Sequence, residues 1–98
     1  MREAVIQARF IKQVKNLRLG LAVKVDCASR RGWPDVLFID NRGVTTYIEF
    51  KNEKGRLSQH QRETHDEMFK LGVVVLVLDS ITAVDEYIKN IMFSAGCS

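Results

Sequence analysis

Apolar residues recur along the chain with a spacing that changes from one segment to the next. Over residues 3–18 they return every three or four positions, which is the spacing of one face of an amphipathic helix. The apolar positions of this segment are Ile6, Phe10, Val14 and Leu17. Gly20 predicts the end of that helix. Residues 21–27 then alternate between apolar and other residues, which predicts a strand with one solvated face.

The middle of the chain predicts a β-hairpin. Pro34 lacks a backbone N–H and therefore belongs at the start of a strand, and residues 36–39 form a short apolar run after it. The cluster Asp40-Asn41-Arg42-Gly43 is typical of a turn, and residues 44–51 are rich in strand-forming side chains. These segments predict two antiparallel strands joined by a tight turn.

The second half predicts a helix, a strand and a further helix. Ser58 followed three residues later by Gln61 is a capping-box sequence, and the helix it opens extends to about residue 71. Residues 73–78 are continuously apolar, which predicts a strand buried on both faces after a right-handed parallel crossover. Residues 80–93 repeat a helical pattern. The predicted fold is α/β, with α-β-β-β-α-β-α order around a four-stranded mixed sheet flanked by helices.

Composition is consistent with one small globular domain over residues 1–98, since 46% of the residues are hydrophobic. Fourteen of the 15 basic residues lie within residues 1–70, beside nine of the 12 acids, which suits an anionic partner or an ordinary solvated surface. Cys27 and Cys97 lack the spacing of a zinc or disulfide motif. With no signal peptide or apolar membrane segment, we expect a soluble, cytoplasmic protein.

One group of charged residues has a distinctive spacing. Asp35 follows a Gly-x-Pro turn, and thirteen residues separate it from Glu49, with Lys51 two positions further. On neighbouring strands the two carboxylates can lie side by side, and Glu49 and Lys51 share one face because strand side chains alternate. Two carboxylates beside a lysine can bind a hard divalent cation and activate water. An exposed Glu49–Lys51 ion pair is the alternative interpretation.

The full set of motifs resembles the virus-type replication-repair nuclease (VRR-NUC) family of the PD-(D/E)xK nuclease superfamily. The similarity rests on Gly32-x-Pro34-Asp35, then Glu49-x-Lys51, then Leu57-Ser58-x-x-Gln61, in that order. The predicted order of elements is similar to the common core of that superfamily, which is a restriction-endonuclease-like fold. Asp-x(n)-Glu-x-Lys alone would be a weak signal, whereas the ordered set is specific.

The resemblance implies a metal-dependent nuclease site. Asp35 and Glu49 would bind Mg²⁺ or Mn²⁺, and the backbone carbonyl of Phe50 would join them. Lys51 would position or deprotonate the attacking water and neutralise charge that develops on the phosphate. No small-molecule cofactor is implied.

Two further residues resemble site residues of the family. Glu3 matches a carboxylate of the first helix that completes the acidic site, although it also suits the helix dipole. Gln61 matches a glutamine beside the catalytic pocket, and its capping-box role is compatible with that. Gln59 stands where relatives commonly carry proline, which changes the first helical position and no catalytic residue.

Four basic residues flank the motif in sequence and are candidate phosphate contacts or parts of solvated loops. They are Arg30, Arg31, Lys54 and Arg56. Trp33 either packs on the sheet or stacks on a base, and packing is the interpretation we favour. His60 and His65 are five positions apart on one helix, a poor spacing for a shared metal, and are interpreted as surface or core residues.

The sequence thus predicts an endonuclease that hydrolyses DNA phosphodiesters. Small members of the resembled family act as homodimers on branched DNA, notably four-way (Holliday) junctions, and the family name suggests a prokaryotic or phage origin. A flap or other branched-DNA nuclease is the alternative within the same class. A catalytically idle nucleic-acid-binding module and a purely structural partner protein are alternatives from other classes, although the latter leaves Glu49 in a strand without a reason.

Overall fold

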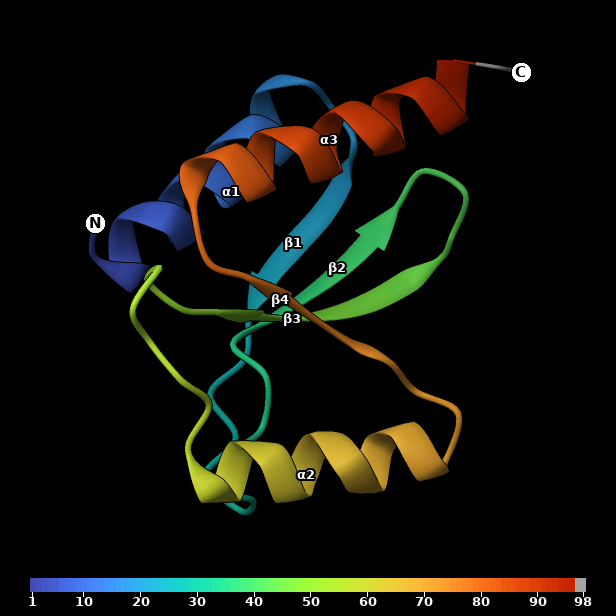
Figure 1. Cartoon of the computed structure of the whole chain (residues 1–98). Coiled ribbons are helices and arrows are strands. Elements are labelled where there is room, and N and C mark those ends of the chain that lie inside the picture. The colour runs from blue at the N-terminus through green and yellow to red at the C-terminus, as the bar shows by residue number, and fades with distance from the viewer. Residues whose placement is uncertain (97–98) are drawn as a thin grey trace.

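A four-stranded sheet separates two helices on one face from a single helix on the other (Figure 1). The structure is a computed structural model and describes residues 1–96; Cys97 lies outside the described residues. Its elements are α1 (Glu3–Asn16), β1 (Gly20–Lys24), β2 (Val36–Asp40), β3 (Thr45–Phe50), α2 (Gln59–Lys70), β4 (Val75–Leu78) and α3 (Ile81–Gly96). The predicted order of elements and the mixed four-stranded sheet are confirmed.

The strands follow one another across the sheet in chain order. β1 pairs with β2 and β2 pairs with β3 in antiparallel fashion, whereas β3 and β4 are parallel. The predicted hairpin turn is held by Asp40, whose Oδ1 accepts hydrogen bonds from the amides of Arg42 at 2.8 Å and Val44 at 3.1 Å. The parallel β3–α2–β4 connection places α2 on the face opposite α1 and α3 (Figure 1).

The hydrophobic core lies between the sheet and the α1–α3 pair. Phe10 of α1 is at its centre, with its ring centroid 5.3 Å from that of Phe38 and 5.8 Å from that of Phe50. The other fully buried apolar side chains come from α1, the sheet and α3, including Ile6, Val14, Val36, Ile48 and Val84. The α2 side is thinner, because α2 buries only Thr64 and Met68. The core therefore fixes β3, which carries Glu49, and β2, which begins directly after Asp35.

The end of α1 differs from the prediction. The helix ends at Asn16, and Arg18 turns the chain with a φ of 53°. Leu17 is consequently 40% exposed, while Leu19 takes the buried position that the helical pattern had assigned to Leu17. Gly20 does not stop the helix; it begins β1, where a Cβ would lie 2.1 Å from the Ile39 carbonyl oxygen.

The two edge strands are less buried than their sequences predict. In β1, Ala22 packs against the core, while Leu21 and Val23 point to the opposite face and are 58% and 42% exposed. β4 is not buried on both faces, since Val77 is 40% exposed. Both results have one cause: α2 is a single helix and cannot cover the whole of the second sheet face. Within the described residues no helix is long and apolar enough to cross a membrane.

Candidate active site

Glu49 occupies the centre of the site and is almost completely buried. It lies on β3 between Ile48 and Phe50, whose side chains enter the α1–α3 core. Because strand side chains alternate, Glu49 points to the α2 side of the sheet. Its side chain is only 1% exposed, so a charge here needs a partner.

Asp35 provides the second carboxylate, immediately before β2. The pairing of Val36 with Ile48 brings it to the level of Glu49, and its Oδ2 accepts a hydrogen bond from the Phe50 amide at 2.9 Å. Burial raises the pKa of Glu49 to about 9, and a hydrogen bond with Asp35 and the negative charge of Asp35 add to this rise. Lys51 acts in the opposite direction. A cation beside Glu49 would therefore favour its charged form.

Gln61 reaches the site from the first turn of α2. Its Oε1 accepts a hydrogen bond from the Ser58 amide at 2.9 Å, and its Nε2 donates one to Glu49 Oε2 at 3.2 Å. Ser58 Oγ accepts from the Gln61 amide, which completes the predicted capping box. One side chain thus serves both as a helix cap and as a neighbour of the buried carboxylate.

Lys51 and Glu3 meet at the border of the site. Lys51 Nζ lies 3.9 Å from Glu3 Oε1, and the two side chains are 15% and 45% exposed. Glu3 is the first residue of α1, and its charge is near enough to raise the pKa of Glu49 slightly. All five residues proposed for catalysis therefore come together: Glu3, Asp35, Glu49, Lys51 and Gln61.

His65 also belongs to this group, and the sequence interpretation missed its position. Its Nε2 lies 3.5 Å from Glu49 Oε1, and its side chain is 12% exposed. Burial lowers the pKa of this histidine, a shift that Lys51 reinforces and Asp35 opposes. The signal that could have found it is the spacing of four residues from Gln61, which places both side chains on one helix face.

The four candidate phosphate contacts lie in the two loops next to the site. Lys54 and Arg56 are exposed in the loop between β3 and α2. Arg30 forms an ion pair with Glu67 and a 3.3 Å hydrogen bond to Thr64, while Arg31 Nη1 lies 3.3 Å from His60 Nε2. Arg30 and Arg31 thus attach their loop to α2, and their role as DNA contacts stays a prediction.

Trp33 packs within the protein, in agreement with the favoured interpretation. Its ring lies edge-on to that of Tyr47, with centroids 5.4 Å apart. A pocket of about 250 Å³ opens beside the pair, between the loop and α2. Trp33 therefore supports the loop that carries Asp35.

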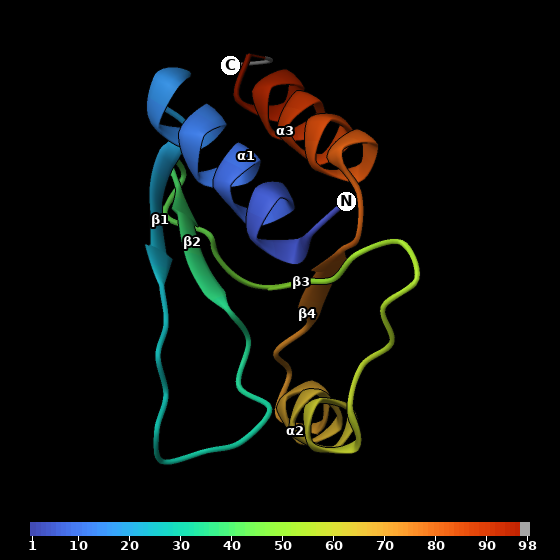
Figure 2. The same ribbon diagram turned by 90° about the vertical axis from the view of Figure 1, so that its left-hand side faces the viewer.

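The loop before β2 lies beside α2 (Figure 2), and Gly32 lets it approach the first turn of that helix closely. Gly32 has a φ of 81°, and a Cβ at this position would lie 2.3 Å from the His60 carbonyl oxygen. Thr64 Oγ1 adds a hydrogen bond to the Arg31 carbonyl at 2.8 Å. The loop that carries Asp35 and the helix that carries Gln61 are thereby fixed against each other.

Gly32→Ala is expected to lower both stability and metal affinity. Gly43→Ala is a matched control, because Gly43 has a φ of 80° and a Cβ added there would meet no other atom within 4 Å. Both variants incur the left-handed strain of about 1–2 kcal/mol, and only Gly32→Ala adds a backbone clash. Chemical denaturation of both variants measures the difference. Equal losses of stability would show that the contact with α2 is unimportant.

The donor set suits a small, hard cation. Asp35, Glu49 and the Phe50 carbonyl would supply oxygen atoms, which are the ligands that Mg²⁺ prefers. Glu49 Oε1 is buried without a hydrogen-bond partner, and burial is the main cause of the raised pKa of Glu49, so a bound cation would stabilise the charged carboxylate. Among the described residues no three His, Cys, Asp or Glu side chains are grouped as a ready metal cage. Mg²⁺ commonly binds one or two carboxylates and keeps several waters, so the site fits it.

Comparisons with known proteins identify the family of the chain. No model of a known protein family matches the chain. A phage protein described as "Putative nuclease p44", from Acyrthosiphon pisum secondary endosymbiont phage 1, is 32% identical over 80 residues, which are 82% of this chain and 85% of that protein. A solved structure described as "VRR_NUC domain" is 33% identical, with a TM-score of 0.78 over 89% of this chain and 94% of that one. The chain belongs to the VRR-NUC family.

The fold of this VRR-NUC domain extends to more distant proteins. A second solved structure, described as "VRR_NUC domain protein", is 15% identical and has a TM-score of 0.71 over 95% of this chain and 89% of that one. At that identity only the restriction-endonuclease-like fold is shared. The predicted family and fold are confirmed, and membership of the family makes this VRR-NUC domain a nuclease.

Proposed function

We propose that this VRR-NUC domain is a metal-dependent endonuclease that hydrolyses phosphodiesters of branched DNA. The observation that supports it most is the buried Glu49, which lies beside the partly buried Asp35 and Lys51. A protein that used Glu49 only for structure would bury a carboxyl group at a cost in stability. A nuclease would use Glu49 together with Asp35 to bind a cation.

Each side chain has a distinct role in this proposal. Bound Mg²⁺ or Mn²⁺ would lower the pKa of a water and offset charge on the phosphate. Asp35 and Glu49, together with the Phe50 carbonyl, would hold the cation, and Glu3 would complete the acidic border. Lys51, a compact positive charge that is 15% exposed, would orient the attacking water and neutralise charge that develops on the phosphate. Gln61 would keep Glu49 in place.

Cleavage of a labelled DNA panel tests the function. The panel contains a four-way junction, a flap and a linear duplex of shared sequence, each with Mg²⁺, Mn²⁺ or chelator. We expect metal-dependent nicking of the junction in opposing strands, faster than of the duplex. Cleavage of flaps but not junctions would replace the junction proposal by the flap-nuclease alternative. Binding without cleavage in either metal would identify an idle binding module.

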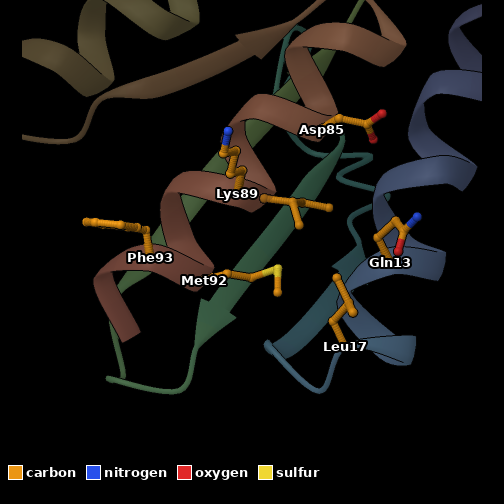
Figure 3. Close-up of a pocket in the computed structure, with 7 residues that line it drawn as sticks. Gln13, Leu17, Asp85, Lys89, Met92 and Phe93 are labelled. Carbon is orange, nitrogen blue, oxygen red and sulfur yellow. The ribbon is translucent and has the colours of Figure 1, made fainter. Parts of the chain in front are cut away.

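A homodimer is part of the proposal, because one active site cuts one strand and symmetric cleavage of two strands needs a two-fold pair. Two exposed apolar surfaces are candidate interfaces. One is the β1 strip, formed by Leu21 and Val23. The other is the α1–α3 groove, a hollow of about 540 Å³ where Met92 and Leu17 face each other and Phe93 points outward (Figure 3).

Light scattering is expected to give a dimer. Leu21→Asp and Phe93→Asp each place a charge on one candidate surface, where the side chains are 58% and 74% exposed and where folding should tolerate the change. The variant that becomes monomeric identifies the interface, because a stable dimer buries on the order of 1,200 Å² or more and a central charge would be desolvated. A monomeric parent protein would contradict the homodimer.

DNA affinity is expected to fall with rising salt. Lys54→Ala combined with Arg56→Ala should reduce the slope of log affinity against log salt by about two, since each phosphate contact contributes about 0.9. Both side chains are exposed, and within residues 1–96 no ion pair joins either of them to a carboxylate. Lys89→Ala, on the opposite side of the sheet, is the control. Fluorescence anisotropy measures the slopes, and unchanged slopes would assign Lys54 and Arg56 to solvent.

A further inference from the structure

Two buried polar atoms face each other without a hydrogen bond at the centre of the site. They are Glu49 Oε1 and His65 Nε2, which lie 3.5 Å apart. Buried polar atoms are rarely left without partners, and those that are ask for an explanation. Both side chains are nearly enclosed, so solvent does not explain the pair. A small movement of either group would form the missing bond.

Helix α2 presents one donor to each oxygen of Glu49. Gln61 and His65 are one helical turn apart and share a face. The orientation of the Gln61 amide is fixed, because its oxygen accepts from Ser58 and its nitrogen must therefore donate to Glu49 Oε2. Glu49 Oε1 remains for His65. One carboxylate oxygen of Glu49 therefore accepts a hydrogen bond from α2, and the other has His65 beside it without a hydrogen bond.

The second oxygen of Glu49 is the nearest acceptor for a donor on His65. An ionised Glu49 is a stronger acceptor, because a hydrogen bond to a charged group is shorter and stronger than a neutral one. A neutral imidazole carries a single N–H, which His65 can place on Nε2.

We propose that His65 is a positioning residue for Glu49, donating an Nε2–H hydrogen bond to the Oε1 atom that has no other partner. The inference rests on the proposed function, because Glu49, the carboxylate that His65 would hold in place, is proposed to bind the cation. Each carboxylate oxygen has two lone-pair directions, so a donor from α2 and a cation can share it. Donors behind a metal-binding carboxylate fix its orientation and are worth about 10- to 100-fold in metal affinity or activity.

The rival role for His65 is direct metal binding through Nε2. It would need a deprotonated Nε2 and the proton on Nδ1, the opposite tautomer. The two roles also differ in what can replace histidine, since a glutamine amide supplies an N–H donor near the position of Nε2 and is a poor substitute for an imidazole ligand.

Manganese binding without DNA provides the test. His65→Phe is expected to weaken Mn²⁺ binding at least about tenfold in calorimetry, and His65→Gln to restore most of the affinity. His60→Gln, an exposed histidine on the same helix, should bind as the parent does. Parent-like affinity in His65→Phe would overturn the proposal. Equal loss in His65→Phe and His65→Gln, with both folded, would also overturn it in favour of direct ligation.

A measurement on the unmodified protein covers the case in which His65→Phe does not fold. Nitrogen-15 NMR of the His65 ring reports its tautomer, and an Nε2–H tautomer is expected in the Mg²⁺ complex. An Nδ1–H tautomer there would overturn the proposal. Neither experiment needs DNA cleavage, so its outcome is separate from that of the nuclease assay. If Glu49→Gln leaves Mn²⁺ affinity unchanged, the metal site itself has failed rather than the role of His65.

Discussion

Glu49→Gln is expected to lower DNA cleavage about a thousandfold while the protein keeps its fold. The substitution preserves the shape of the side chain and removes the negative charge. A cation at such a site contributes several kcal/mol to stabilising the transition state, and a loss of about 4 kcal/mol corresponds to a thousandfold in rate. Single-turnover cleavage of the preferred branched DNA, with calorimetry of Mn²⁺ binding, measures the effect.

Lys51→Ala is the matched comparison for Glu49→Gln. Lys51 borders the same site but carries no oxygen ligand in its side chain, so its removal should abolish cleavage and leave Mn²⁺ binding in place. Glu49→Gln should lose both. Full activity in Glu49→Gln would remove this residue from the mechanism, and full activity in Lys51→Ala would do the same for the lysine.

The metal-free protein is expected to lose stability as pH rises from about 6.5 to about 9. The pKa of Glu49 is raised by burial from 4.5 to about 9, so the folded state holds a proton that the unfolded state releases. The stabilising contribution is complete below pH 4.5 and disappears as pH passes through the folded value of about 9. One proton changes the free energy of unfolding by up to about 1.4 kcal/mol per pH unit. Urea denaturation across this range measures the slope.

The window is chosen to isolate Glu49. Burial lowers the pKa of His65 from 6.5, so its effect lies at lower pH, while burial raises the pKa of Tyr87 from 10.0, so its effect lies higher. Glu49→Gln should flatten the pH dependence and leave the variant more stable than the parent at about pH 9. Saturating Mg²⁺ should flatten it in the parent. An equal slope in parent and variant would show that Glu49 does not cause the pH dependence in this range.

Much of the fold was predictable, because many of the core residues recur in the sequence at the spacing of a helix or a strand. Phe10 and Val14 occupy the helical positions that predict burial, and the Ser58 capping box begins α2 where its sequence indicates. The edge strands were less predictable. The sequence of β1 shows which side chains share a face. Leu21 is nevertheless exposed, because α2, the helix on that face of the sheet, does not cover β1. The spacing of residues within a strand does not show how much of the sheet face a distant helix covers.

The site shows a similar division. The positions of Asp35 and Glu49 follow from a hairpin whose register the turn fixes, and their pairing was predictable on that basis. The position of His65 depends on how α2 is rotated against β3, which the chain sets through contacts distant in sequence, such as that of Thr64 with the Arg31 carbonyl. The spacing between His60 and His65 gave no indication of this, whereas the four-residue spacing from Gln61 to His65 does.

The thin packing of α2 has a consequence for how the site is assembled. Carboxylates on the sheet belong to the cooperative core, whereas Gln61 and His65 belong to a helix held by one loop, two buried side chains and a few polar bonds. Such elements open locally at lower free energy than the core around them. The amides of α2 should therefore exchange with deuterium sooner than those of α1. The carboxylates would then keep their positions while α2 opens and closes locally, and binding of substrate or cation would stabilise the closed position of Gln61 and His65.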